Sequence, residues 1–100
     1  MGSSSRITAG ANKTLPLKQP QIGHLIRELR QLAGLTQQQL ALRLGVAYGT
    51  INRWENARVQ PSSLALQQIR SVIDELGDSP SPKLREGSRD LLLSYLGIQD

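Results

Sequence analysis

Apolar residues recur every three to four positions along several stretches of the chain, the spacing that places them on one face of an amphipathic helix. The first stretch begins at Gln21 and ends before Gly34, a residue suited to a helix C-terminus. The second is introduced by Thr36, and Gln39 three residues later completes a capping-box pattern. A fourth is capped by Ser62 or Ser63 and closed by Gly77. The pattern predicts five helices, over about 21–33, 37–44, 48–56, 63–76 and 84–97.

Breaker residues divide the chain between these helices. The N-terminal segment is rich in Gly, Ser, Thr and Lys and contains Pro16, and Pro80 and Pro82 interrupt the chain after the fourth helix. The sequence therefore predicts an all-α protein, a compact bundle of four to five helices with an additional C-terminal helix. Its expected parts are a flexible basic arm (1–19), a helical domain (20–77), a Pro-containing linker (78–83) and the C-terminal helix (84–97).

The second and third helices are joined by only three or four residues, so they must cross at a steep angle. Such a crossing needs a small residue on the first helix, and Ala41 occupies that position. The turn needs a residue that tolerates positive φ, and Gly45 is there. The facing positions are apolar: Leu40, Leu44, Val46, Ile51 and Trp54. Together they predict a helix-turn-helix centred on residues 37–56.

The run TQQQLALRLGVAYGTINRWENARVQPSSLAL resembles the helix-turn-helix of the Cro and phage-repressor (XRE-like) family, and the likeness extends over residues 21–76. The resemblance implies a phage-repressor type of DNA-binding domain whose third helix enters the major groove, usually as a dimer on a two-fold operator. It also implies a structural salt bridge between Arg30 and Glu55. Two residues depart from the family pattern: Ala47 replaces a Ser or Thr cap, and Ala57 replaces a C-terminal Gly.

Candidate DNA contacts follow from the third helix. Ile51 and Trp54 must face inward, so the opposite side of this helix is exposed. The resemblance places the base-reading candidates on that side: Ala47, Tyr48, Gly49, Asn52 and Arg53. Arg53 can bind a guanine edge and Asn52 an adenine edge, whereas Gly49 has only a backbone role or none. Phosphate candidates are Gln37, Arg43, Thr50, Asn56 and Arg58, with pairing to a neighbouring acid as the alternative for Arg43.

Charge placement supports an anionic partner for the front of the chain. The net charge is +4, and residues 1–58 hold eight Lys and Arg residues against two acids. The chain has no Cys, which excludes disulfides and thiolate metal sites and fits the cytoplasm. Its single His24 is expected to be solvated or packed against a helix. No metal site is expected, because a single His and no Cys cannot form a metal cluster, and no membrane span is expected, because no stretch approaches the ~20 consecutive apolar residues that one needs. No cofactor or enzymatic activity is expected, because neither a phosphate-binding loop nor a nucleophile with His and Asp partners is present.

Two functions remain open from the sequence. The first is a sequence-specific transcriptional regulator of double-stranded DNA, most naturally a repressor. The second is a protein-interaction module or antitoxin-type component in which the same fold binds a partner protein. The Leu-rich tail is compatible with both functions, because it can either form a homodimer or pack on the first and fourth helices of its own domain. The tail residues concerned are Leu91, Leu92, Tyr95 and Leu96.

Overall fold

The computed structural model describes residues 14–97, and within this range it contains helices and no strand. The helices are α2 (Gln21–Ala33), α3 (Gln37–Leu44), α4 (Tyr48–Glu55), α5 (Ser63–Gly77) and α6 (Pro82–Leu96). The all-α bundle predicted from the hydrophobic pattern is confirmed.

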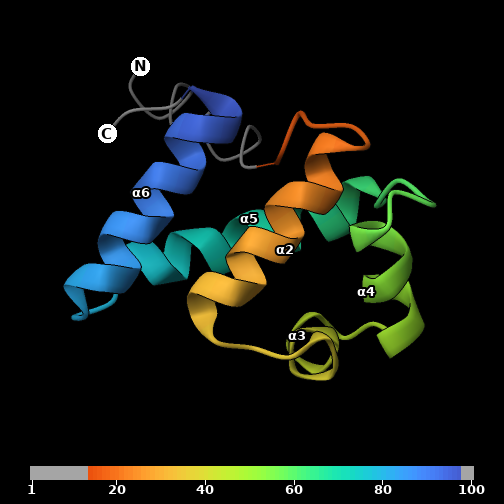
Figure 1. The fold of residues 1–100 in the computed structure, drawn as a ribbon, viewed down its shortest axis with the longest axis horizontal. Helices are drawn as coiled ribbons and strands as arrows, with labels where there is room; N and C mark the ends of the chain where they lie inside the picture. Colours follow the sequence, from red (N-terminus) through yellow and green to blue (C-terminus); the bar gives the residue numbers. More distant parts are fainter. Residues whose placement is uncertain (1–13, 98–100) are drawn as a thin grey trace, which may run out of the picture.

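The helix α2 is the centre of the bundle and packs against α4, α5 and α6 (Figure 1). The short helices α3 and α4 pack against each other at one end of the molecule. At the other end, α6 lies across α2 and α5, far from α4 in the view of Figure 1. The α3–α4 pair therefore has an outer surface that the C-terminal helix does not cover.

The core is made of Leu, Ile, Val, Ala and one Trp, contributed by all five described helices. Ile22 and Ile26 of α2, Leu40 of α3, Ile51 of α4 and both isoleucines of α5 are fully excluded from solvent. The predicted facing residues of the helix pair are buried, except that Val46 is only partly buried. Burial of this apolar surface is the main stabilising term for such a small bundle.

Local signals set most helix ends. Thr36 and Gln39 form the predicted capping box, in which the Gln39 N–H donates to Thr36 Oγ1 at 3.1 Å and the Thr36 N–H to Gln39 Oε1 at 2.9 Å. Gly45 ends α3 in the left-handed conformation at a φ of 71°. Ala47 precedes α4 with an extended backbone, and its side chain makes no capping hydrogen bond. The start of α4 therefore lacks the stabilisation that a Ser or Thr cap provides.

The end of α4 carries a strained residue. Ala57 adopts a φ of 58°, a left-handed conformation that costs a residue with a Cβ about 1–2 kcal/mol. A Gly at this position, as the resemblance described above implies, would avoid that cost. The sequence departure at Ala57 is therefore visible as backbone strain immediately after the helix.

The prediction of a flexible arm up to residue 19 is wrong for its last part. Leu15 is 1% exposed and belongs to the core. The side chain of Gln19 donates to the carbonyl oxygens of Trp54 at 2.9 Å and Val59 at 2.7 Å. Gln60 reciprocates by accepting from the Gln19 N–H at 3.0 Å. These long-range hydrogen bonds hold the segment against the loop that follows α4; residues 1–13 lie outside the described range.

The linker after α5 is shorter than the predicted range 78–83, because α6 already begins at Pro82. The C-terminal helix does not form a separate unit. Ser81 caps α6, which begins at Pro82 because proline suits the first turn of a helix. Leu91 and Leu92 are 6% and 8% exposed and lie in the same core as α2 and α5. The buried Ser88 hydroxyl donates to the carbonyl oxygen of Ile73 at 2.7 Å.

The tail is therefore a helix of its own domain. Tyr95 donates from its hydroxyl to Glu28 of α2 at 2.7 Å, and burial together with this carboxylate raises the pKa of Tyr95 to about 12. Leu96 packs partly against the core. Of the two interpretations that the sequence left open, intramolecular packing is the one observed. The alternative, a dimer contact through Leu91 and Leu92, is wrong because both side chains are buried in the core of their own domain. Within residues 14–97, no helix combines the length and apolar character needed to cross a bilayer.

Truncating Leu91 to Ala should lower the free energy of unfolding by about 2–5 kcal/mol, because it leaves a cavity beneath α6. The change should be the same at low and high protein concentration when unfolding is followed by circular dichroism in denaturant. Leu93→Ala, at a position 43% exposed on the same helix, is the matched control and should change stability by less than about 0.5 kcal/mol. A destabilisation by Leu91→Ala that depends on protein concentration would contradict intramolecular packing.

Candidate nucleic-acid interface

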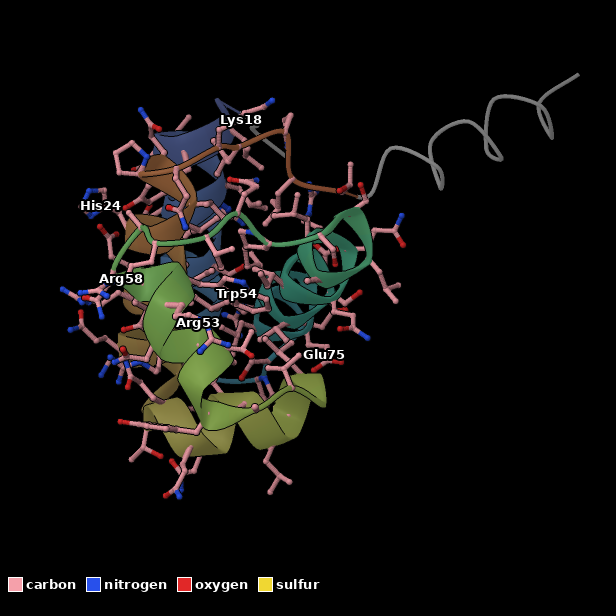
Figure 2. The ribbon with its side chains drawn as sticks, turned by 90° about the vertical axis from the view of Figure 1, so that its right-hand side faces the viewer. Lys18, His24, Arg53, Trp54, Arg58 and Glu75 are labelled. Atoms are coloured by element: carbon pink, nitrogen blue, oxygen red, sulfur yellow. The ribbon has the colours of Figure 1, made fainter. Side chains whose placement is uncertain are left out.

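The two sides of α4 differ sharply in burial. Ile51, Trp54 and Glu55 are buried on its inner side. Tyr48 is 53% exposed and Arg53 is exposed on its outer side. Figure 2 shows Arg53 projecting from the outer side of α4, while Trp54 lies toward the rest of the domain. The turn at Gly45 and the packing of α3 hold α4 in this orientation.

The approach of α2 to α4 depends on Gly23. A Cβ atom added at Gly23 would lie 2.5 Å from the backbone oxygen of Trp54, closer than any side chain tolerates. The same oxygen accepts the hydrogen bond from Gln19, whose Oε1 accepts in turn from the Gly23 N–H at 3.0 Å. The C-terminal end of α4 is therefore held directly against the first turn of α2.

A buried carboxylate joins the inner side of α4 to α2. The Glu55 side chain is 0% exposed. Arg30 donates to it through two nitrogens, Nε to Oε2 at 2.8 Å and Nη2 to Oε1 at 3.1 Å. Arg27, one turn earlier on α2, places its Nε 3.4 Å from Oε1. The salt bridge that the resemblance implied between Arg30 and Glu55 is thus present, with a second arginine beside it.

Two opposing effects set the pKa of Glu55. Burial alone would raise it, because a carboxylate loses its hydration in the interior. Hydrogen bonds from Arg30 and Gln37, with the positive charge of Arg30, outweigh burial and lower the pKa of Glu55 below its ordinary value. The hydrogen bond from Arg30 to this carboxylate correspondingly raises the pKa of Arg30. Glu55 is therefore an ionised, acceptor-only group at neutral pH.

Three amide side chains continue outward from Glu55. Gln37, the first residue of α3, donates from Nε2 to Glu55 Oε1 at 3.0 Å. Its Oε1 accepts from Asn52 Nδ2 at 3.4 Å. The Oδ1 of Asn52 accepts in turn from Asn56 Nδ2 at 3.1 Å. The structure thus connects three sequence-predicted DNA contacts into one chain of hydrogen bonds.

Arg53 lies along the outer side of α4 next to two small residues. Its Nη2 donates to Thr50 Oγ1 at 3.4 Å. A Cβ at Gly49 would lie 3.3 Å from its Nη1, so the glycine leaves the space that the guanidinium occupies. Arg53 has no acidic partner among residues 14–97 and is held only by this weak contact.

The remaining basic candidates, Arg43 and Arg58, lie on different sides of the helix pair. Arg43 of α3 forms an ion pair with Glu75 of α5, which is the alternative that the sequence left open. Arg58 is exposed just after α4. In Figure 2, Arg58 and Glu75 project on opposite sides of α4, with Arg53 between them. Arg58 is therefore the basic side chain beside the C-terminal end of α4.

Three residues that position α4, namely Gln19, Gly23 and Arg27, were not predicted from the sequence. Arg27 could have been found, because it lies one helical turn before Arg30 and shares its face. Gln19 and Gly23 carry no local signal, since the hydrogen-bond partners of Gln19 lie 35 and 40 residues further along the chain. In the described part of the chain, no group of His, Cys, Asp and Glu side chains is placed to hold a metal ion. His24 is exposed.

The buried carboxylate gives stability a defined pH dependence. Because the pKa of Glu55 is lowered in the folded state, its contribution is fully present above the ordinary carboxylate pKa and is lost as pH falls through the folded value. Replacing Glu55 with Ala should cost about 3–5 kcal/mol at pH 7, since Arg30 would lose its buried partner. Denaturation between pH 7 and pH 2 should show a shallower acid loss for the variant than for the wild type. Parallel curves would contradict this role; Glu86→Ala, exposed on α6, is the control.

Comparison with known families supports the geometry. The family model described as helix-turn-helix matches residues 26–76, about half of the chain, which includes all of α3 and α4 and most of α2 and α5. No curated protein and no solved structure matches the chain. The matched family is the Cro and phage-repressor type, in which this helix pair binds double-stranded DNA. The chain belongs to the Cro and phage-repressor (XRE-like) helix-turn-helix family and carries its DNA-binding domain.

Proposed function

We propose that this chain is a sequence-specific transcriptional repressor, which occupies a promoter by placing the outer side of α4 in the major groove of double-stranded DNA. The observation that carries the proposal is the orientation of α4. Its apolar side and Glu55 are buried against α2, while Arg53 and Tyr48 project outward. A helix held this way by the rest of the domain can insert without first rearranging.

Electrostatics favours the same surface. Between residues 29 and 73 the only acid is Glu55, and it is buried against Arg30. The exposed part of the α3–α4 pair therefore carries Arg53 and Arg58 without an acid of its own, whereas Arg43 is paired with Glu75 of α5. DNA phosphates approaching this surface meet positive charge, which speeds association and stabilises the complex.

The side chains on the outer side of α4 are of the types that recognise bases. The Arg53 guanidinium can donate to O6 and N7 of a guanine, and the Asn52 amide matches N6 and N7 of an adenine. The Tyr48 ring can contact a thymine methyl group. Ala47 and Gly49 are small and let the backbone approach the base edges closely. These contacts would supply sequence preference.

Phosphate contacts would come from residues around this surface. Arg58 is exposed at the end of α4, and Thr50 and Asn56 are polar residues on the same helix or at its end. Arg43 is a weaker candidate because Glu75 already pairs with it. We further propose that the chain acts as a homodimer on two half-sites about 10 base pairs apart, or a multiple of that distance. Leu91 and Leu92 are not available for that dimer, since they are buried in the core.

Replacing Arg53 with Ala should weaken binding to the preferred duplex by about 1–3 kcal/mol and relax preference at one base position. Selection of bound sites from random duplexes at a stated salt concentration would measure both effects. Arg89→Ala, which removes the same charge from the exposed side of α6, is the matched control. Should the selected sites be unchanged in the Arg53 variant, the assignment of Arg53 to base recognition would fail. Absence of any duplex preference in the wild type would favour the protein-interaction module instead.

Replacing Arg58 with Ala should weaken binding to all duplexes by a similar factor, because a phosphate contact carries no sequence information. The slope of log K against log salt should become shallower by about 0.9, since the variant neutralises one phosphate fewer. Arg43→Ala is the informative comparison and should change the slope less, since this arginine is paired with Glu75. Fluorescence anisotropy titrations at several salt concentrations provide the slopes. A change confined to one base position in the Arg58 variant would contradict a phosphate role.

A further inference from the structure

The chain of hydrogen bonds from Glu55 to Asn56 has a direction. Glu55 is an ionised carboxylate and can only accept, so the Gln37 amide must turn its NH2 group toward it. The Gln37 oxygen is then left facing α4, where it can only accept. Asn52 must therefore present its own NH2 group to Gln37, and its oxygen is left for Asn56. One buried group thereby determines which end of each amide is nitrogen and which is oxygen.

We propose that Gln37 is a positioning residue for base recognition, which holds the Asn52 amide with its oxygen toward Asn56 and its nitrogen toward α3. The inference deepens the proposed function and rests on it, because it assumes that Asn52 faces a base. It differs from the role expected of Gln37 from the sequence, which was a direct phosphate contact.

The consequence for recognition is geometric. A free asparagine amide rotates between two orientations that exchange donor and acceptor, and it can meet an adenine edge in either. In this protein, one N–H of Asn52 and one lone pair of its oxygen remain available after the bonds to Gln37 and Asn56. The two hydrogen bonds therefore fix the order of the remaining donor and acceptor. That order suits an adenine on one strand and disfavours the reversed pair, so Gln37 contributes to preference without touching the base.

The burial of the hydrogen-bonded side chains supports the fixed orientation of the Asn52 amide. Glu55 is fully buried, and Gln37 and Asn52 are half-buried, so water competes only weakly for their hydrogen bonds. Asn56 is exposed and forms the outer end. The nitrogen and the oxygen of the Gln37 amide are both hydrogen-bonded within the protein, to Glu55 and to Asn52.

The test uses Gln37→Met, which keeps the length of the side chain and removes both polar atoms. Glu55 retains Arg30 and Arg27 in this variant, so its carboxylate keeps partners and the fold is expected to persist. Gln38→Met, at an exposed neighbouring position on α3, is the matched control. Asn56→Ala is a second variant, which frees the Asn52 oxygen through a substitution at an exposed position.

The first measurement needs no DNA. Side-chain amide resonances of Asn52 in the free full-length protein should shift in Gln37→Met and in Asn56→Ala but not in Gln38→Met. Identical Asn52 resonances in the wild type and Gln37→Met would overturn the hydrogen-bond chain, whatever the protein binds.

The second measurement is site selection with titrations against salt. Gln37→Met should reduce discrimination at a single base position by about tenfold, the lower range for one well-formed amide–base pair, and leave the salt slope unchanged. A similar loss of affinity for all duplexes, with discrimination at every base position intact, would show a phosphate contact by the neutral Gln37 amide and overturn the positioning role. A wild type that prefers no duplex would overturn the proposed function itself, and the resonance shifts would still report on the hydrogen-bond chain.

Discussion

The buried carboxylate of Glu55 is the interaction on which the arrangement of the binding surface depends. An unpaired carboxylate in the interior would be strongly unfavourable, so its burial requires donors from several elements. Arg30 and Arg27 supply them from α2 and Gln37 from α3. Because these donors come from two other helices, satisfying one charge brings α2, α3 and α4 together and sets the rotation of α4 about its axis.

That rotation separates two tasks along one short helix. The apolar Ile51 and Trp54 stabilise the domain, and Gly23 allows α2 to approach the backbone beside them. The opposite side carries Tyr48 and Arg53, which the domain does not use for its own packing. A rigid scaffold that holds a few polar side chains outward lowers the entropy lost when they contact a ligand. The C-terminal helix contributes to the scaffold from the far end of the bundle, where its leucines complete the core.

Local features of the sequence were sufficient for the helices and the turn. The capping box at Thr36, the glycine at residue 45 and the 3.6-residue apolar stripes act within a few residues, and their effects appear in the structure as predicted. Strain at Ala57 was foreseeable for the same reason. The packing of Leu15 and the hydrogen bonds of Gln19 were not foreseeable, because a polar, proline-containing segment has no periodic pattern and its partners are distant in the sequence. The tail was ambiguous, since an apolar stripe does not specify what covers it.

The sequence by itself determined the helical class, the crossing of α3 and α4, and the side of α4 that must be polar, because periodicity and turn chemistry are short-range. Tertiary structure alone decided that Arg43 pairs with Glu75, that α6 closes the core, and that Gln37 connects Glu55 to Asn52. Whether a hydrogen bond or ion pair forms between two helices depends on differences of a few tenths of an ångström in the distance between its atoms. Such distances exist only after the helices have packed.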